Sequence, residues 1–271
     1  MQSGDTARKI NREIEAIDVH GHYGTALSSA SAVRNEITSG DAQTVLQRAA
    51  SANIAFTVVS PLAGLFPRAH GAPVSANEDA AQVVATHEGL GYWVILDPLR
   101  SETFEQARRL LASPKCVGIK IHPEEHCYCI REHGQVIFEF AAAQRSVVMT
   151  HSGEQNSLPE DYLPFADAFP EVTLILAHLG CGYDGDPTHQ VRAIQQSRHG
   201  NVFVDLSSAC NVQSGLIEWA VQQIGAEKML FGTDSPLHDA RFELGKIVTA
   251  DISETAKRKI LGLNAIKLLE L

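Results

Sequence analysis

Two histidines, two positions apart, stand at the end of the first apolar run of the chain. They are His20 and His22, in the segment Asp18-Val19-His20-Gly21-His22. Residues i and i+2 of a β-strand point to the same side, so both imidazoles would face one space. Two imidazoles presented together form half of a metal site. The other ligands must therefore come from distant parts of the sequence.

Three later apolar runs also end in residues of metal-binding type, namely His151, His178 and Asp234. Imidazoles combined with a carboxylate suit zinc, and also manganese, iron or nickel. Such a set leaves room for a water molecule, whose pKa the metal would lower toward about 7. We therefore predict a catalytic divalent metal ion, with zinc as the first choice.

Eight short apolar runs would supply the strands that position these residues. They begin at Ala16, Ile54, Tyr92, Cys116, Ser146, Val172, Asn201 and Lys228. Segments with helical spacing lie between them, at 41–52, 77–88, 102–112, 136–145, 189–198 and 215–225. Each run is rich in Val, Ile, Leu or Phe, as expected of strands buried on both faces of a parallel sheet. Asn77 is expected to cap its helix, and residues 61–75 are expected to form a long, functional loop.

Strands that alternate with helices indicate the α/β class and a (β/α)8 TIM barrel, formed by residues 1–271 as a single domain. In such a barrel the carboxyl ends of all strands meet at one rim, where the predicted ligands would converge. An open doubly wound sheet is the competitor. It usually carries a glycine-rich phosphate turn after its first strand, where this chain has His-Gly-His.

Composition narrows the class of partner. The formal net charge of −10 disfavours nucleic acids and anionic membranes. No run approaches the roughly 20 apolar residues of a membrane span, and the polar first fifteen residues carry no secretion signal. The odd number of cysteines, five, suggests reduced thiols and a cytoplasmic protein. The expected partner is a small-molecule substrate, and homo-oligomerisation stays open.

Four motifs resemble those of the amidohydrolase superfamily, in the amidohydrolase-2 branch that includes aminocarboxymuconate-semialdehyde decarboxylase. They are Asp18-Val19-His20-Gly21-His22, Thr150-His151-Ser152-Gly153, Ala177-His178-Leu179-Gly180 and Gly232-Thr233-Asp234-Ser235-Pro236. The resemblance implies that His20, His22, His151 and Asp234 hold the metal. It also implies that His178 acts on the substrate or on the metal-bound water, and that Asp234 doubles as the proton carrier.

Further candidates would contact the substrate. Lys120 and His122 share a face at the end of the fourth run. In many binuclear relatives a lysine at this strand is carboxylated and bridges two metals, but Lys120 lies one pleat deeper than His122, so that role is doubtful. The alternative is a buried lysine paired with Asp205 or Asp18. Arg68 and His70, in the loop after the second run, could bind a carboxylate, although a solvated loop arginine is an equal alternative.

Two reaction classes remain open. The first is hydrolysis of a C–O or C–N bond, in an amide, lactone or related small molecule, by a metal-activated water. The second is a lyase reaction of the same branch, decarboxylation or hydration of a small unsaturated or aromatic acid. Aromatic residues make up only 6% of the chain. That scarcity favours hydrolysis, since decarboxylases of the branch tend to carry aromatic residues for an aromatic acid.

Overall fold

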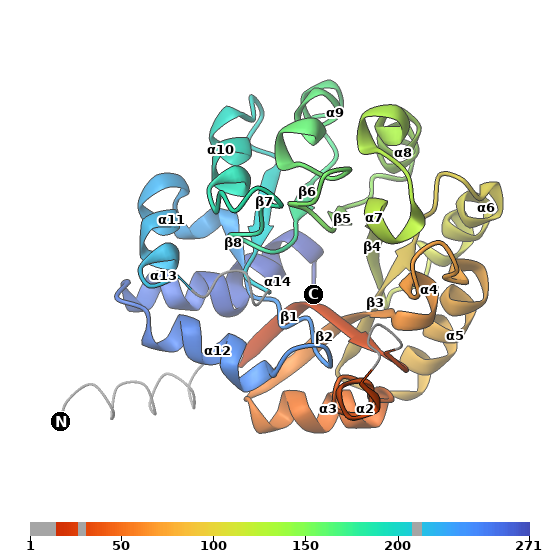
Figure 1. Cartoon of the computed structure of the whole chain (residues 1–271), viewed down its shortest axis with the longest axis horizontal. Coiled ribbons are helices and arrows are strands. Elements are labelled where there is room, and N and C mark those ends of the chain that lie inside the picture. The colour runs from red at the N-terminus through yellow and green to blue at the C-terminus, as the bar shows by residue number, and fades with distance from the viewer. Residues whose placement is uncertain (1–14, 27–30, 208–212) are drawn as a thin grey trace.

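Eight parallel strands form one sheet in the order in which they occur in the sequence. The computed structural model describes residues 15–26, 31–207 and 213–271. Each strand pairs with the next, and Figure 1 shows them as a ring surrounded by helices. The predicted (β/α)8 barrel is thereby confirmed. The strands are β1 (Ala16–Tyr23), β2 (Ile54–Pro61), β3 (Leu90–Ile95), β4 (Cys116–Ile121), β5 (Val148–Thr150), β6 (Leu174–Leu176), β7 (Val202–Asp205) and β8 (Met229–Leu230).

Helices occupy the connections between the strands. The α-helices are α2 (Ala32–Ile37), α3 (Ala42–Ser51), α4 (Leu62–Leu65), α5 (Pro73–Thr86), α6 (Ser101–Leu110), α7 (Pro123–His126), α8 (Ile130–Gln144), α9 (Leu163–Ala168), α10 (His189–Gln196), α11 (Leu216–Ile224), α12 (Ala240–Thr249), α13 (Glu254–Arg258) and α14 (Asn264–Leu269). Two 3-10 helices, η1 (Pro159–Tyr162) and η2 (Ala226–Lys228), and the π-helical turn η3 (Lys259–Leu263) complete the set within the described residues.

Two apolar clusters explain why the strands are hydrophobic on both faces. The larger cluster lies between the sheet and the surrounding helices. The smaller cluster fills the barrel interior and includes Val19, Trp93 and Ile175. Trp93 is fully buried there, and its indole N–H donates to the Val19 carbonyl at 2.8 Å. The interior is therefore a packed floor beneath the carboxyl ends of the strands.

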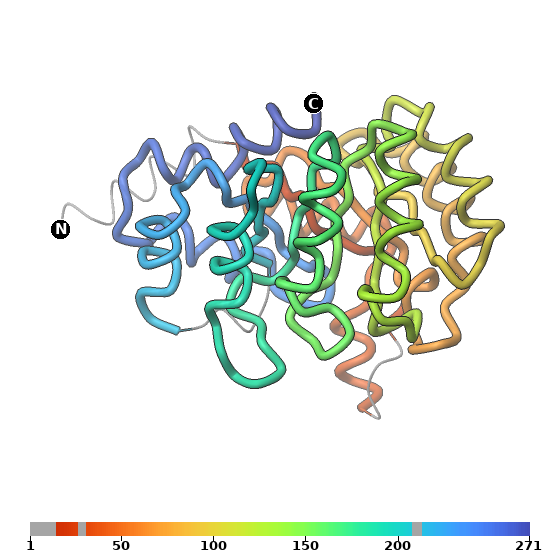
Figure 2. Tube along the Cα trace, turned by 90° about the horizontal axis from the view of Figure 1, so that it is seen from above, coloured from red at the N-terminus to blue at the C-terminus, as the bar shows by residue number. Residues whose placement is uncertain are grey.

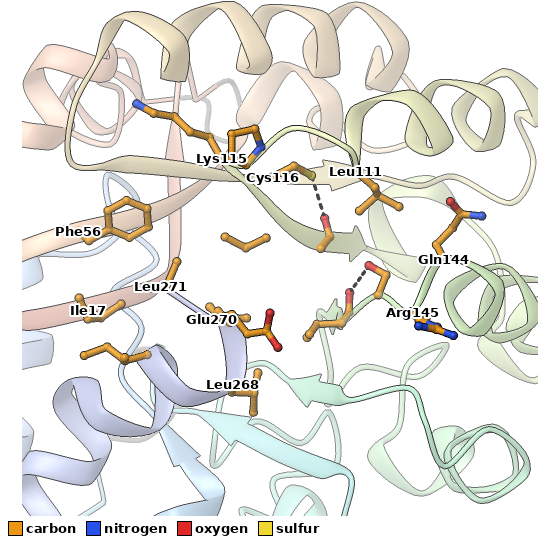
Figure 3. A pocket seen from close by; sticks show the side chains of 17 residues that line it. Ile17, Phe56, Leu111, Lys115, Cys116, Gln144, Arg145, Leu268, Glu270 and Leu271 are labelled. Carbon is orange, nitrogen blue, oxygen red and sulfur yellow. Dashed lines mark hydrogen bonds between the residues drawn. The ribbon is translucent and has the colours of Figure 1, made fainter.

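The two ends of the barrel differ. In Figure 2 the C-terminus lies on one side of the molecule, and α2 projects on the opposite side. A hollow of about 780 Å3 next to the C-terminus is shown in Figure 3, lined by residues such as Phe56, Lys115 and Glu270. None of the predicted site residues lines this hollow.

Three sequence-based expectations require correction. Asn77 lies inside α5 rather than at its start, and its buried amide hydrogen-bonds to the backbone of Ile95 in β3. The segment 61–75 is only partly irregular, because α4 and the first turn of α5 fall within it. Cys181 is disulfide-bonded, so the expectation of reduced thiols is wrong for that residue.

Of the described helices, none has the length and apolar character needed to cross a membrane.

The first and last strands are joined by one buried carboxylate. Asp18 Oδ1 accepts from the backbone N–H groups of His20 and Thr233, each at 3.0 Å. The hydroxyl of Thr233 donates to Asp18 Oδ2 at 2.6 Å. Burial raises the pKa of Asp18 to about 7, although these hydrogen bonds oppose the shift. The carboxylate thus ties β1, at His20, to the segment that carries Asp234.

We predict that Asp18→Ala destabilises the barrel, because three buried donors lose their acceptor. An unsatisfied buried donor costs about 1–3 kcal/mol, so the free energy of unfolding should fall by roughly 3 kcal/mol or more. Urea denaturation followed by circular dichroism measures this change. The control variant Thr233→Val removes the two hydrogen bonds of the hydroxyl, to Asp18 and from the Ser235 N–H, but leaves both backbone donors to Asp18 paired, so it should cost less, about 2 kcal/mol. Equal urea midpoints for Asp18→Ala and the unmodified chain would contradict the assignment.

Candidate metal centre

Three of the predicted metal ligands converge at the carboxyl end of the barrel. One ligand atom from each of His20, His22 and Asp234 lies within 4.8 Å of the other two, and all three residues are buried. Asp234 Oδ1 lies 2.9 Å from His22 Nε2 and 3.6 Å from His20 Nε2. The two histidines of β1 therefore face the same space, as their spacing predicted.

Each of these two histidines has one ring nitrogen that faces away from the site. The hydrogen bond of that outer nitrogen determines whether the inner nitrogen carries a proton or a lone pair. His22 Nδ1 donates to the carbonyl of Ser60 in β2 at 2.9 Å. His20 Nδ1 lies 2.8 Å from Asp205 Oδ2 at the end of β7. A neutral imidazole carries one N–H, so both rings present a lone pair at Nε2. His22 Nε2 and the Asp234 carboxylate then bring two electron-rich atoms to 2.9 Å, which is favourable when a metal ion or a proton lies between them. The donor set fits a divalent metal.

Desolvation keeps the buried imidazoles neutral. Burial lowers the pKa of His20 to about 4 and that of His178 to about 3, with the electrostatic effects of Lys120 on His20 and of His151 on His178 as the next causes. Burial would raise the pKa of Asp234, but its close contact with His22 and the neighbouring His20 and His178 outweigh this and hold the pKa well below its usual range. Neutral imidazoles beside an ionised carboxylate are the protonation states that metal binding requires.

Lys120 extends from β4 into this cluster. Its ammonium Nζ lies 2.8 Å from His20 Nε2, and the residue is almost completely buried. Burial lowers its pKa to about 8, against the attraction of Asp205 and Asp234. Neither suggested partner forms a direct pair with it: Asp205 bonds to His20, and Asp18 bonds to the turn of β8. A positive charge therefore occupies the floor of the site.

His151 and His178 face each other across the cavity. His151 Nδ1 lies 3.1 Å from His178 Nε2. The remaining nitrogen of His178 donates to the carbonyl of Ser207, and that of His151 lies 2.9 Å from Glu154 Oε1. His151 belongs to neither of the two metal-binding clusters found among the described residues. Its role as the fourth ligand stays a prediction.

Backbone conformation directs two of these side chains. His178 has φ of 70° and Asp234 has φ of 55°, both in the left-handed region. That region is uncommon for residues other than glycine, and the surrounding structure must stabilise it. For Asp234, its own backbone N–H donates to the His20 carbonyl at 2.6 Å. The chain leaves β6 and β8 in turns that aim both side chains into the site.

His122 forms another wall of the site. Its ring stacks on His151 with centroids 4.2 Å apart and meets Phe66 edge-on at 6.2 Å. Its Nδ1 accepts from the backbone N–H of Glu125 at 3.4 Å, so in the neutral ring Nε2 carries the proton. A cavity of about 80 Å3 is lined by His20, His22, Leu65, Phe66, Lys120, His122, His151, His178, Asp234 and Leu237.

Two predicted substrate contacts lie outside this lining. Arg68 is 54% exposed, and its Nη2 lies 3.4 Å from Glu125 Oε1 and 3.7 Å from Glu154 Oε2. His70 is exposed on the same loop. The pairing of Arg68 with two carboxylates makes it a poor receptor for a substrate carboxylate.

Sequence reasoning did not assign roles to the residues that hold the histidines. Asp205 was considered only as a partner of Lys120, and Ser207 and Glu154 were missed. The position of Asp205 and Ser207 at the end of the seventh run was a signal that could have identified them, because polar strand ends line the rim of a barrel. For Glu154, the only signal in the sequence was its closeness to His151.

The chain is similar to a known protein family in sequence and to solved decarboxylases in fold. The family model described as Amidohydrolase matches residues 17–271. No curated protein matches the chain. The fold is similar to that of 2,6-dihydroxybenzoate decarboxylase from Rhizobium, with a TM-score of 0.76, 14% identity, and coverage of 95% of this chain and 99% of that one.

Two further decarboxylases share the fold. The 5-carboxyvanillate decarboxylase of Sphingomonas paucimobilis has a TM-score of 0.71 and 14% identity, covering 96% of this chain and 100% of its own. The dihydroxybenzoic acid decarboxylase of Polaromonas sp. JS666, solved with bound manganese and the inhibitor 2-nitroresorcinol, has a TM-score of 0.75 and 16% identity, covering 95% and 97%.

We predict that the purified protein holds close to one divalent ion per chain, and that His20→Ala combined with His22→Ala removes it. The double variant loses the Nε2 lone pairs of both histidines. Because Asp18 still joins β1 to β8, the barrel should fold. Elemental analysis measures the metal, and circular dichroism checks the fold. His70→Ala, which changes an exposed histidine outside the cavity, is the control. Undiminished metal in a folded double variant would disprove the ligand assignment.

Proposed function

The chain belongs to the amidohydrolase family, and from that membership we propose that it is a metal-dependent decarboxylase of a small carboxylic acid. The observation that carries the proposal is the buried ammonium of Lys120 beside the inward-facing imidazoles. A buried positive charge complements a carboxylate substrate, whereas a neutral amide or lactone does not require one. The similar folds described above are those of decarboxylases, which supports the same choice over hydrolysis.

The proposed metal ligands are His20, His22 and Asp234, with His151 as the fourth. Manganese is bound in one structural relative, and zinc, iron and nickel suit the same donors. When bound, the ion would act as a Lewis acid toward oxygen atoms of the substrate.

Residues of the chain supply the remaining parts of the reaction. Lys120 would hold the substrate carboxylate, and the apolar side chains of Leu65, Phe66 and Leu237 would pack against the rest of the molecule. His122 would donate from Nε2 to a substrate oxygen, because its Nδ1 is already an acceptor. The site therefore combines charged, apolar and hydrogen-bonding contacts.

Decarboxylation breaks the bond between the carboxyl carbon and its neighbour, leaves the electron pair on that neighbour and releases CO2. The carbon must then gain a proton from a group that holds one at neutral pH. Lys120, with its pKa lowered to about 8, holds such a proton and lies where the carboxylate would leave. Asp234, whose pKa is held low, could pass on a proton only after receiving one.

Hydrolysis of a C–O or C–N bond is the second candidate, and one observation favours it. Asp234 is ionised beside the cavity, so it can accept the proton of an attacking water and return it to a leaving group. His178, with its inward nitrogen unprotonated, is the alternative acceptor.

We predict that Lys120→Met sharply lowers turnover of an acid substrate while the metal stays bound. Methionine keeps the length and packing of the chain but removes both the charge and the proton. Loss of a general acid lowers the rate by about 10²-fold or more, and kcat/KM should fall by at least that factor. Steady-state kinetics and elemental analysis on the same preparation test both parts. If Lys120→Met retained full kcat/KM, the lysine would have no part in the reaction.

Solvent labelling separates the two reactions. In ¹⁸O-labelled water a hydrolase must place solvent oxygen in its product, whereas a decarboxylase releases CO2 and adds no solvent oxygen to the remaining molecule. We expect CO2 release and an unlabelled organic product, measured by mass spectrometry after a screen of aromatic acids, lactones and amides. Label in the organic product without CO2 would establish hydrolysis instead.

A further inference from the structure

His151 is held at both ring nitrogens by side chains from different loops. Its Nδ1 faces His178 Nε2 at 3.1 Å across the cavity, and its Nε2 faces Glu154 Oε1 at 2.9 Å on the outer side. Glu154 lies in the loop that follows β5 and does not line the cavity. Its carboxylate is thus placed to act on the site only through His151.

The partners determine where the proton of His151 lies. A carboxylate can only accept, so the nitrogen facing Glu154 must carry hydrogen. In a neutral ring Nδ1 then presents its lone pair to the cavity. His178 does the same at Nε2, because its Nδ1 donates to the Ser207 carbonyl. Two lone pairs held 3.1 Å apart require a shared cation or proton between them.

We infer that Glu154 is a positioning residue, which fixes the proton of His151 on Nε2 and so directs the Nδ1 lone pair into the cavity. The inference deepens the proposed function, because it rests on His151 being a ligand of the proposed metal. It does not depend on whether the reaction is decarboxylation or hydrolysis. Carboxylates that orient metal-binding histidines in this way typically change metal affinity by 10- to 100-fold when removed.

Arg68 has a supporting part in this arrangement. Its Nη2 lies 3.7 Å from Glu154 Oε2, on the oxygen that His151 does not use, and 3.4 Å from Glu125 Oε1. Arg68 and Glu154 are both partly exposed, at 54% and 43% of their side-chain surface, so solvent weakens their attraction. The hydrogen bond to His151 therefore matters more than the ion pair behind it.

Three variants separate these contributions. Glu154→Ala removes the acceptor, whereas Glu154→Gln keeps a carbonyl oxygen for His151 and removes the negative charge of the carboxylate. Glu160→Ala is the matched control, because Glu160 holds His189 at 3.0 Å in the same manner but His189 does not line the cavity. Competition with a chromogenic chelator measures zinc affinity for each protein without any substrate.

We expect Glu154→Ala to weaken zinc binding by about 10- to 100-fold. The zinc affinity of Glu154→Gln should stay within about fivefold of that of the unmodified protein, which is the scale of an exposed ion pair. The zinc affinity of Glu160→Ala should equal that of the unmodified protein. Equal zinc affinities for Glu154→Ala and Glu160→Ala would overturn the inference. So would a Glu154→Gln variant that binds as weakly as Glu154→Ala, since the acceptor alone should suffice.

A spectroscopic measurement keeps the test decisive if Glu154→Ala fails to fold or if zinc does not bind. Long-range ¹H–¹⁵N correlation spectra of the metal-free protein report which nitrogen of His151 carries hydrogen. We expect hydrogen on Nε2 in the unmodified protein and in Glu154→Gln, and a mixture of tautomers in Glu154→Ala. Hydrogen on Nδ1 alone in the unmodified protein would overturn the inference. An Nε2 proton in a protein that binds no metal would instead refute the proposed function and leave the positioning role of Glu154 intact.

Discussion

The constraint on which the site depends is that each inward-facing imidazole is held by its outward nitrogen. The holding groups are oxygen acceptors for His20, His22, His151 and His178, so these four rings present lone pairs. At His122 the neighbour is a backbone N–H, and that ring presents a proton instead. The same side chain thus becomes a candidate ligand or a candidate donor according to one hydrogen bond. The chemistry of the cavity is set by atoms that lie outside it.

The parallel barrel supplies those holding groups from neighbouring strands. The Ser60 carbonyl in β2 lies beside His22 because β1 and β2 pair in register, with His22 opposite Ser60. Asp205 and Ser207 at the end of β7 reach His20 on one side and His178 on the other. Closure between β8 and β1, through Asp18 and Thr233, is what brings β7 near β1. An open sheet would separate these strands and leave the histidines without their partners.

The sequence was informative where a feature repeats along the chain. Strand ends recur in a regular order, so all eight strands and the convergence of His20, His22 and Asp234 could be predicted from periodicity and motif. Contacts between loops have no such periodicity. Glu154 and Arg68 come from different loops, and nothing in their spacing indicates that one would hold His151 and the other Glu154. Arg68 consequently looked like a free carboxylate receptor, although it is already paired. Asn77 was misplaced for the same reason, since its amide serves a neighbouring strand rather than its own helix.

The position of Lys120 links metal binding to substrate binding. Its ammonium donates to His20 Nε2, the same lone pair that the proposed metal would use. One lone pair cannot serve both cations, so a metal ion bound there would leave the ammonium without that acceptor. A buried ammonium without an acceptor is costly, and a substrate carboxylate in the cavity would provide one. A carboxylic acid should therefore bind more favourably when the metal is present than when it is absent. A neutral amide or lactone would leave the charge of Lys120 uncompensated. The electrostatics of this single residue thus favour a carboxylic acid as the substrate.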